Sequence, residues 1–343
     1  MRGFGWGRAL ALIAATVLTS CGGGDGNGGD GGDGPPSPVQ LTVMTWNVLH
    51  GGRFDRITSG SPAEIPSAID AVWAGMEAGD PRARMRAVAA EIAAARPELA
   101  GLQEAALWRS QPRDGSPGVE YDLVGLVLDE LRARGAEYAV AAAASAVDVA
   151  LPGAAAVYRF TDRDVVLARA GLQTVNARGG TYEARLPLPL PGGGSSGVAR
   201  EWTSVDVELG GRTLRFVSTH LETVKAVSAA QAAELVELVG QELPVVLVGD
   251  FNSGPGDPAY ELLVSVAGGF RDAWEAGAGA GPTCCRDALD DPGAEVSQRV
   301  DLVLHRGFTP RSATLVGADA SSFQEGRWPS DHVGVLATLE LAP

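Results

Sequence analysis

Residues 244–252 read Pro-Val-Val-Leu-Val-Gly-Asp-Phe-Asn, and this run says more about the architecture than any other part of the chain. Its continuous apolar run, rich in β-branched side chains, predicts a strand that is buried on both faces. The run ends at Gly249, and the polar residues Asp250 and Asn252 follow directly. A strand buried on both faces needs cover on both sides, so the stretch indicates an α/β protein whose sheets are covered by helices.

The same arrangement, a polar side chain at the end of a strand-like run, recurs along the chain. The other examples are Asn47 in 40–48, Glu104 after 99–103, His220 after 213–219, Asp301 in 300–305, and Asp331 with His332 before 333–341. Because a sheet delivers the side chains at its strand ends to one edge, we expect these acids, amides and imidazoles to share a pocket.

Helices are predicted between the strands. Apolar residues recur at helical spacing over 84–96, 123–134 and 224–240. Further strands are predicted over 138–146, 164–168 and 201–208, the last of which forms a hairpin with 213–219. Scattered Gly, Pro and Ser predict loops over 49–82 and 109–119, and a turn or flap at 192–196 after a proline-rich stretch.

The composition is ordinary for a globular protein, but the charge is acidic. The chain has 343 residues, of which 45% are hydrophobic and 20% charged, and the formal net charge is −15. This charge disfavours tight non-specific binding of polyanions such as nucleic acids, although a bound divalent cation would change the local field. A basic stripe interleaved with aromatic side chains, which would form a stacking platform for single strands, is not evident.

The first 20 residues have the features of an export signal. Arg2 and Arg8 precede a short apolar run, Ala9–Leu18, and small residues follow it. The run is too short for a membrane-spanning helix. Leu18-Thr19-Ser20-Cys21 resembles the lipobox of bacterial lipoproteins, in which the cysteine is lipidated and becomes the mature N-terminus. A plain signal peptide with an incidental cysteine is the alternative.

Residues 22–38 consist almost entirely of Gly, Asp, Pro, Ser and Asn. Such a segment buries no apolar surface, so it predicts a solvated, flexible tether between the lipid anchor and the folded part of the chain. We therefore expect a cell-envelope lipoprotein that is exported and held to a membrane through Cys21.

Cys284 and Cys285 are the other cysteines, and they are adjacent. A disulfide between neighbours is strained because their Cα atoms lie closer than a disulfide prefers. No further metal ligand of suitable spacing accompanies them in the sequence. Export permits oxidation, so a disulfide and two free thiols both remain open.

The polar set suits hydrolysis of a phosphate ester. This reaction needs charge neutralisation on the phosphoryl oxygens, an aligned and deprotonated water, and a stabilised leaving oxygen. Glu104, with Asp331 and Asn47, offers the oxygen ligands that Mg²⁺ or Mn²⁺ prefers. Asp250 can take a proton from water, and Asn252 and His220 can donate hydrogen bonds to phosphate. Asp301 can orient His332. His50 and His305 lack such a motif and are interpreted as surface or packing residues.

Six strings in the chain resemble the endonuclease/exonuclease/phosphatase superfamily and follow that family's order. They are Thr-Trp-Asn-Val-Leu-His (45–50), Gly-Leu-Gln-Glu (101–104), Ser-Thr-His-Leu-Glu (218–222), Gly-Asp-Phe-Asn-Ser (249–253), Arg-Val-Asp-Leu-Val-Leu (299–304) and Ser-Asp-His-Val-Gly-Val (330–335). The resemblance implies an α/β fold, namely a four-layer α/β sandwich of two mixed β-sheets packed face to face with helices outside, and one divalent-metal cleft.

The resemblance also implies roles for the matching residues. Asn47, Glu104 and Asp331 match the metal side of the site, and His220, Asp250, Asn252, Asp301 and His332 match the catalytic side. Arg163 or Asp164 is expected to face the cleft as well. These matches divide the chain into a lipoprotein signal peptide (1–20), a tether (21–38) and a catalytic domain (39–343).

The motifs predict the reaction and leave the substrate open. We expect a monomeric, exported hydrolase of a phosphodiester or phosphomonoester, with nucleic acid and lipid headgroups both open as substrates. A non-catalytic surface binding module on the same fold is the alternative, and it predicts lost metal ligands. Specificity is expected in the loops, which the motifs do not determine.

Overall fold

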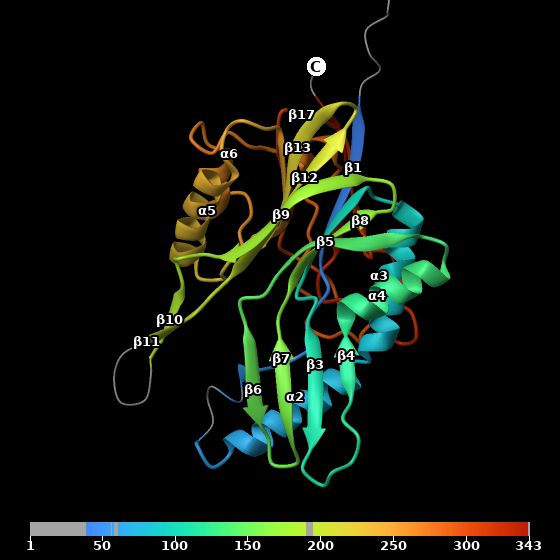
Figure 1. Cartoon of the computed structure of the whole chain (residues 1–343), viewed down its shortest axis with the longest axis vertical. Helices are drawn as coiled ribbons and strands as arrows, with labels where there is room; N and C mark the ends of the chain where they lie inside the picture. Colours follow the sequence, from blue (N-terminus) through green and yellow to red (C-terminus); the bar gives the residue numbers. More distant parts are fainter. Residues whose placement is uncertain (1–38, 56, 58–60, 190–194, 342–343) are drawn as a thin grey trace, which may run out of the picture. The chain divides into compact units, whose positions relative to one another are not determined.

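A six-stranded mixed sheet forms one half of the fold in the computed structural model, which describes residues 39–55, 57, 61–189 and 195–341 (Figure 1). In spatial order its strands are β17 (Phe308–Val316), β18 (Gly334–Leu341), β1 (Gln40–Asn47), β2 (Leu99–Gln103), β8 (Asp164–Arg169) and β5 (Tyr138–Ala144). The pairing of β1 with β2 is parallel, and the others are antiparallel. Asn47 therefore lies beside Gln103, next to Glu104.

A second six-stranded sheet forms the other half. Its strands, in spatial order, are β15 (Arg271–Asp272), β16 (Asp301–Arg306), β14 (Val245–Asp250), β13 (Arg212–His220), β12 (Glu201–Leu209) and β9 (Gln173–Thr181). Here β13 and β14 are parallel, with His220 opposite Asp250, and Asp250 is opposite Asp301 on antiparallel β16. The register thus aligns three of the predicted site residues in one row.

The two sheets pack face to face through an apolar core. Val43 and Leu99 of the first sheet and Phe216 and Val248 of the second belong to one buried apolar cluster. Gly101 on β2 permits the close approach, because a Cβ there would lie 2.6 Å from Ser218 Oγ on the facing sheet. The confirmed fold is therefore the predicted α/β arrangement of two mixed, packed sheets.

Helices cover the outer faces, α3 and α4 on one side and α5 and α6 on the other (Figure 1). Their bounds are α3 Pro81–Ala95, α4 Leu123–Ala133, α5 Lys225–Val239 and α6 Pro258–Val264. Each outer face contributes its own buried cluster, which includes Met85, Val88 and Leu131 on the first side and Leu235 and Leu247 on the second. Two helical and two sheet layers result.

The prediction of a loop over 49–82 is wrong, because this segment contains α2 (Ile65–Ala78). Ile69, Val72, Trp73 and Met76 recur at helical spacing and are buried, so the amphipathic signal was present among the Gly and Pro residues. Helix α2 packs beside a third sheet, and Trp73 stacks on Tyr158 of that sheet with ring centroids 4.9 Å apart.

This third sheet was not predicted. Its strands, in spatial order, are β4 (Glu120–Asp122), β3 (Leu107–Pro112), β7 (Ala156–Thr161) and β6 (Asp148–Pro152). The prediction of a loop over 109–119 is therefore wrong at its start, where β3 lies. In sequence these strands are short and only partly apolar, so tertiary contacts decide them.

Short elements complete the described part of the chain. They are the hairpin of β10 (Leu186–Pro189) and β11 (Ser195–Val198), and the 3-10 helices η1 (Ala273–Ala276) and η2 (Ala320–Ser322). Among the helices within 39–341 that the structure describes, none has the length and apolar character needed to cross a membrane. The predicted signal peptide, Cys21 and the tether lie outside the described residues.

Candidate active site

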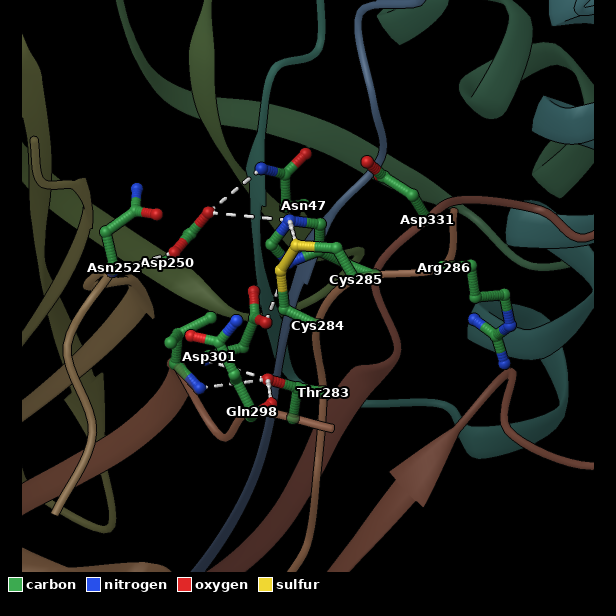
Figure 2. The surroundings of a disulfide bond; sticks show 12 residues. Asn47, Asp250, Asn252, Thr283, Cys284, Cys285, Arg286, Gln298, Asp301 and Asp331 are labelled. Atoms are coloured by element: carbon green, nitrogen blue, oxygen red, sulfur yellow. Dashed lines mark hydrogen bonds and ion pairs between the residues drawn. A yellow bond between two sulfur atoms is a disulfide. The ribbon is translucent and has the colours of Figure 1, made fainter. Parts of the chain in front are cut away.

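The Asn47 amide joins the ends of the two sheets. Its Nδ2 donates to Glu104 Oε1 at 3.1 Å and to Asp250 Oδ2 at 3.1 Å, and the residue is 1% exposed. Asn47 ends β1, Glu104 follows β2, and Asp250 ends β14 on the facing sheet. Three side chains predicted to share a pocket therefore meet at one point, and Figure 2 shows Asn47 and Asp250 facing each other.

His220 and Asn252 lie on the second-sheet side of Asp250. His220 Nε2 is 3.4 Å from Asp250 Oδ2 and 3.2 Å from Asn252 Nδ2. Asn252 has a positive φ of 45°, and its main-chain N–H donates to Asp250 Oδ1 at 2.9 Å. This tight turn aims both members of the Asp-Phe-Asn string at the imidazole.

His332 and Asp301 form a buried dyad beside the same carboxylate. His332 Nδ1 lies 2.8 Å from Asp301 Oδ2, and His332 Nε2 lies 3.8 Å from Asp250 Oδ2. The Asp301 contact assigns the proton to Nδ1 and leaves Nε2 directed toward Asp250. The predicted pairing of Asp301 with His332 is present in the structure.

Asp331 lies next to this dyad on the loop between β17 and β18. Its Oδ1 accepts from Ser330 Oγ at 3.3 Å, and the same hydroxyl donates to the main-chain oxygen of Asn47 at 2.7 Å. Trp46 Nε1 also donates to the His332 carbonyl at 3.1 Å. The Ser-Asp-His string is thus tied to the end of β1, although it lies almost 290 positions away in sequence.

Arg84 of α3 fixes these two loops to each other. The buried guanidinium donates to the carbonyls of Val48, Leu49 and Pro329, at 2.7, 3.0 and 3.2 Å. Burial lowers the pKa of Arg84 to about 10, which still leaves it charged at neutral pH. No pattern in the sequence indicates this role, because Arg84 only begins a predicted amphipathic helix there.

The acids of the site are crowded. Burial is the main reason that the pKa of Asp250 is raised to about 7, and the negative charge of Asp301 also raises this pKa. Burial also raises the pKa of Asp331, with a further contribution from Glu104. Burial acts the same way on Glu104, but His50, His220 and hydrogen bonds outweigh it and hold its pKa below the ordinary value.

The two imidazoles differ in their charge state. Burial works against protonation of His332, but Asp301 and Asp250 raise its pKa well above the ordinary value. Burial and the Arg200 guanidinium lower the pKa of His220 well below it. His332 is therefore the cationic imidazole of the site, and His220 is the neutral one.

This donor set fits a divalent cation. Asp250, Asp301 and His332 place one ligand atom each within 4.8 Å of one another, a group that could hold a metal ion. Asn47, Glu104 and Asp331 supply further oxygen atoms, the ligands that Mg²⁺ and Mn²⁺ prefer. A cation would also offset the burial and the Glu104 charge that together raise the pKa of Asp331.

Sequence reasoning missed His50 and Arg200. The interpretation of His50 as a surface or packing residue is incomplete, because its Nε2 lies 3.5 Å from Glu104 Oε2 and its main-chain N–H donates to the same oxygen at 2.9 Å. Its position three residues after Asn47 was the available signal. Arg200 Nη1 lies 3.2 Å from His220 Nε2, so it brings a positive charge to the site.

Arg163 and Asp164 support Glu104 from behind. Arg163 Nε donates to the Ala105 carbonyl at 2.9 Å, and the main-chain N–H of Glu104 donates to the buried Asp164 carboxylate. Both residues hold the turn that carries Glu104. His305 is buried on β16, with Nε2 4.0 Å from Glu275 Oε1, which agrees with its interpretation as a packing residue.

Cys284 and Cys285 are joined by a disulfide and lie beside the dyad (Figure 2). Cys285 Sγ is 3.7 Å from His332 Nε2. The sequence left the disulfide open and placed no further ligand near the pair. The structure brings in His332, 47 positions away, which adjacent-residue spacing could not reveal.

A family model matches most of the chain. The model described as Endonuclease/Exonuclease/phosphatase family matches residues 44–332, which include every site residue named from Asn47 to His332. The chain belongs to this family. Members of the endonuclease/exonuclease/phosphatase family are hydrolases that act on phosphate esters, and they typically depend on a divalent metal.

A curated relative of this family member matches only part of the chain. Mouse tyrosyl-DNA phosphodiesterase 2 is 29% identical over 181 residues, which cover 47% of this chain and 45% of the mouse protein. The chain therefore aligns with less than half of the length of that curated relative.

Solved structures show the same fold. A family protein from Bacteroides thetaiotaomicron has a TM-score of 0.56 and 18% identity, with 89% of this chain and 96% of that chain covered. A mannosyl-6-phosphatase from the same organism has a TM-score of 0.53 and 18% identity, covering 87% and 99%. Truncated Caenorhabditis elegans TDP2 has a TM-score of 0.52 and 18% identity, covering 88% and 97%.

The anchoring role of Arg84 can be measured by substitution. We expect Arg84→Met to lower the free energy of unfolding by at least about 2 kcal/mol, because three carbonyls lose their donor in a buried place. Arg86→Met on the same helix removes only an exposed ion pair with Glu325 and should cost about 0.5 kcal/mol or less. Urea unfolding of both variants gives the comparison, and equal losses would contradict the role.

Proposed function

We propose that this family member is an exported, divalent-metal-dependent phosphoesterase that hydrolyses a phosphodiester or a phosphomonoester. One observation carries the proposal: the ends of both sheets bring Asn47, Glu104, Asp250 and the Asp301–His332 dyad together. This set holds a base, a cationic imidazole and cation ligands within one site.

Asn47, Glu104 and Asp331 would hold the metal in this proposal. The bound ion would supply charge neutralisation on the phosphoryl oxygens and would help to stabilise the developing charge. Glu104 is suited to this place because its pKa is lowered, so its carboxylate is charged at neutral pH. Asn47 also fixes Glu104 and Asp250 relative to each other, which would orient the base toward a phosphate held at the metal.

Asp250 would take the proton from the attacking water. Its pKa of about 7 matches a general base that works near neutral pH. The turn at Asn252 holds one carboxylate oxygen through its main-chain N–H, and the other oxygen faces the two imidazoles. Water bound between Asp250 and the phosphate would therefore be aligned before it reacts.

The imidazoles and Arg200 would bind the phosphoryl oxygens. His332 is protonated and oriented by Asp301, so its Nε2–H can donate to an oxygen that gains negative charge. His220 and Asn252 lie on the opposite side of Asp250 and offer neutral donors. Arg200 adds a positive charge next to His220. These donors would surround one phosphate group.

The proposal specifies the class of substrate, phosphate esters, and names no single compound. Two relatives are named for different kinds of phosphate ester: one is a DNA phosphodiesterase, and the other is a sugar phosphatase. The net charge of −15 favours small or locally presented phosphate esters over long polyanions held without specificity. Extracellular nucleic acid and lipid headgroups both stay within the proposal, as does action as a monomer.

A metal-dependence assay tests the proposed reaction. We expect the purified protein to hydrolyse bis-p-nitrophenyl phosphate with Mg²⁺ or Mn²⁺, to lose this activity in chelator, and to recover it when either ion is restored. Plasmid DNA, RNA, sphingomyelin and inositol phosphates then rank the substrates. Absence of turnover by folded protein across these metals and substrates would favour the non-catalytic binding module.

Substitution of Asp250 or His332 tests the assigned chemistry. We expect Asp250→Ala and His332→Ala each to lower turnover by at least about a hundredfold, the scale for acid–base groups, while the circular dichroism spectrum stays unchanged. Asp129→Asn, on the exposed face of α4, is the matched control and should retain turnover. Near-normal rates in either folded alanine variant would remove that residue from the mechanism.

The cellular location of the protein is a separate part of the proposal. We expect Cys21→Ser to release the protein from the membrane fraction, because the substitution removes the thiol that would carry the lipid. Fractionation of cells that express either form measures this. If the variant still requires detergent for extraction, lipidation at Cys21 is wrong, and the proposed reaction is unaffected.

A further inference from the structure

Cys284 and Cys285 place two sulfur atoms on the active-site imidazole. Cys285 Sγ lies 3.7 Å from His332 Nε2, and both sulfurs and this nitrogen lie within 4.8 Å of one another. Figure 2 shows the disulfide beside Asp250 and Asp301, the two carboxylates that contact the imidazole. Cys285 is exposed, whereas Cys284 is 5% exposed, so a dissolved ion can reach the pair from one side.

The backbone holds the pair firmly against the dyad. The Cys284 N–H donates to the Gln298 carbonyl at 2.9 Å, and the Gln298 N–H donates back to the Cys284 carbonyl at 2.8 Å. On the other side, the Arg286 N–H donates to the Asp331 carbonyl at 2.9 Å. These bonds join the cysteine segment to the strand start at Asp301 and to the loop of His332, so the three donor atoms are positioned in advance.

Arg286 strengthens this placement. Its guanidinium lies 4.0 Å from the ring centre of Trp328 and donates to the carbonyls of Ser330 and Gly317. The side chain is thus directed away from the disulfide, as Figure 2 shows. The guanidinium of Arg286 therefore packs on Trp328, and the imidazole of His332 lies next to the sulfurs.

The donor chemistry differs from that of the proposed magnesium ligands. Thiolate and imidazole select soft and borderline ions such as Zn²⁺ and Cd²⁺, whereas Mg²⁺ takes oxygen. His332 has the support typical of a ligating histidine, because its Nδ1 is held by a carboxylate and its Nε2 lies 3.7 Å from Cys285 Sγ.

We propose that the reduced Cys284–Cys285 pair and His332 Nε2 form a binding site for one thiophilic metal ion. The ion would occupy the imidazole that the proposed hydrolysis requires. Its binding does not depend on the proposed function, whereas the resulting inhibition rests on it.

The site opens by a two-electron reduction with an external dithiol. A thiolate of the reductant attacks one sulfur of the disulfide and forms a mixed disulfide, and the second reductant thiol displaces the protein sulfur. The reductant leaves as its own disulfide, and the protein gains two thiols. Each thiol then loses its proton to solvent as its sulfur bonds to the divalent ion, and His332 Nε2 likewise releases its proton to solvent before it bonds to the ion. The fourth position is open to water.

Titration of Cd²⁺ into the anaerobically reduced protein, in excess Mg²⁺, tests the proposal. We expect cadmium–thiolate charge-transfer absorption to saturate at one ion per chain. It should be absent from the oxidised protein and from the Cys284→Ser/Cys285→Ser double variant. Absorption that is equal in the reduced protein and the double variant, or a disulfide that the dithiol does not reduce, would overturn the site.

Two further variants separate the ligands. His332→Gln should bind Cd²⁺ at least tenfold more weakly, and unchanged affinity would remove His332 from the site. If His332→Gln does not fold, Asp301→Asn, which releases the imidazole, should weaken binding about tenfold or more by the same logic. Glu104→Gln is the matched control for the oxygen site and should retain the thiolate absorption.

The inhibition is measured separately from binding. Relative to its own rate in Mg²⁺ without Cd²⁺, reduced wild-type protein should lose hydrolysis of bis-p-nitrophenyl phosphate as the thiolate absorption saturates, and the double cysteine variant should not. Cd²⁺ binding without loss of hydrolysis would show that His332 is not needed for turnover, which contradicts the proposed function and leaves the metal site standing.

Discussion

The Asn47 amide is the interaction on which the site depends, because it joins the two sheets at their ends. One nitrogen donates to Glu104 from the first sheet and to Asp250 from the second. This is possible only because the sheets pack face to face with β1–β2 and β13–β14 parallel, so that their carboxyl ends lie together. A small residue at Gly101 allows the approach. The apolar core between the sheets therefore determines the distance between Glu104 and Asp250.

Around this junction the protein concentrates charges that oppose one another. Asp250, Asp301 and Asp331 are crowded, and His332 is kept protonated by two of them. Such an arrangement is costly in a buried place unless something compensates it. Arg84 and the hydrogen bonds of Ser330 hold the loops in position against this repulsion. The favourable free energy of the surrounding packing thus offsets the cost of these buried charges, and a divalent cation would reduce that cost further.

The disulfide adds a second kind of chemistry to the same imidazole. Hard oxygen ligands lie on the Glu104 side of the site, and soft sulfur donors lie on the exposed side at Cys285. His332 belongs to both, because Asp301 occupies one ring nitrogen and leaves the other available.

The helix α2 and the third sheet, β4-β3-β7-β6, extend the first half of the fold beyond the two packed sheets. Variation in substrate within this fold is expected in such additions.

Patterns in the sequence predicted most strands of the two large sheets and most of the residues at their ends, but not β9, β15 or β17. Long apolar runs such as Val245–Val248 specify burial through their own composition, and the Asp-Phe-Asn and Ser-Asp-His strings are local. The tertiary structure alone decided the third sheet, whose short strands lack a strong pattern. It also decided the roles of Arg84, His50 and Arg200, and the contact of Cys285 with His332. Each of these depends on side chains brought together by folding, and distance along the chain carries no information about such contacts.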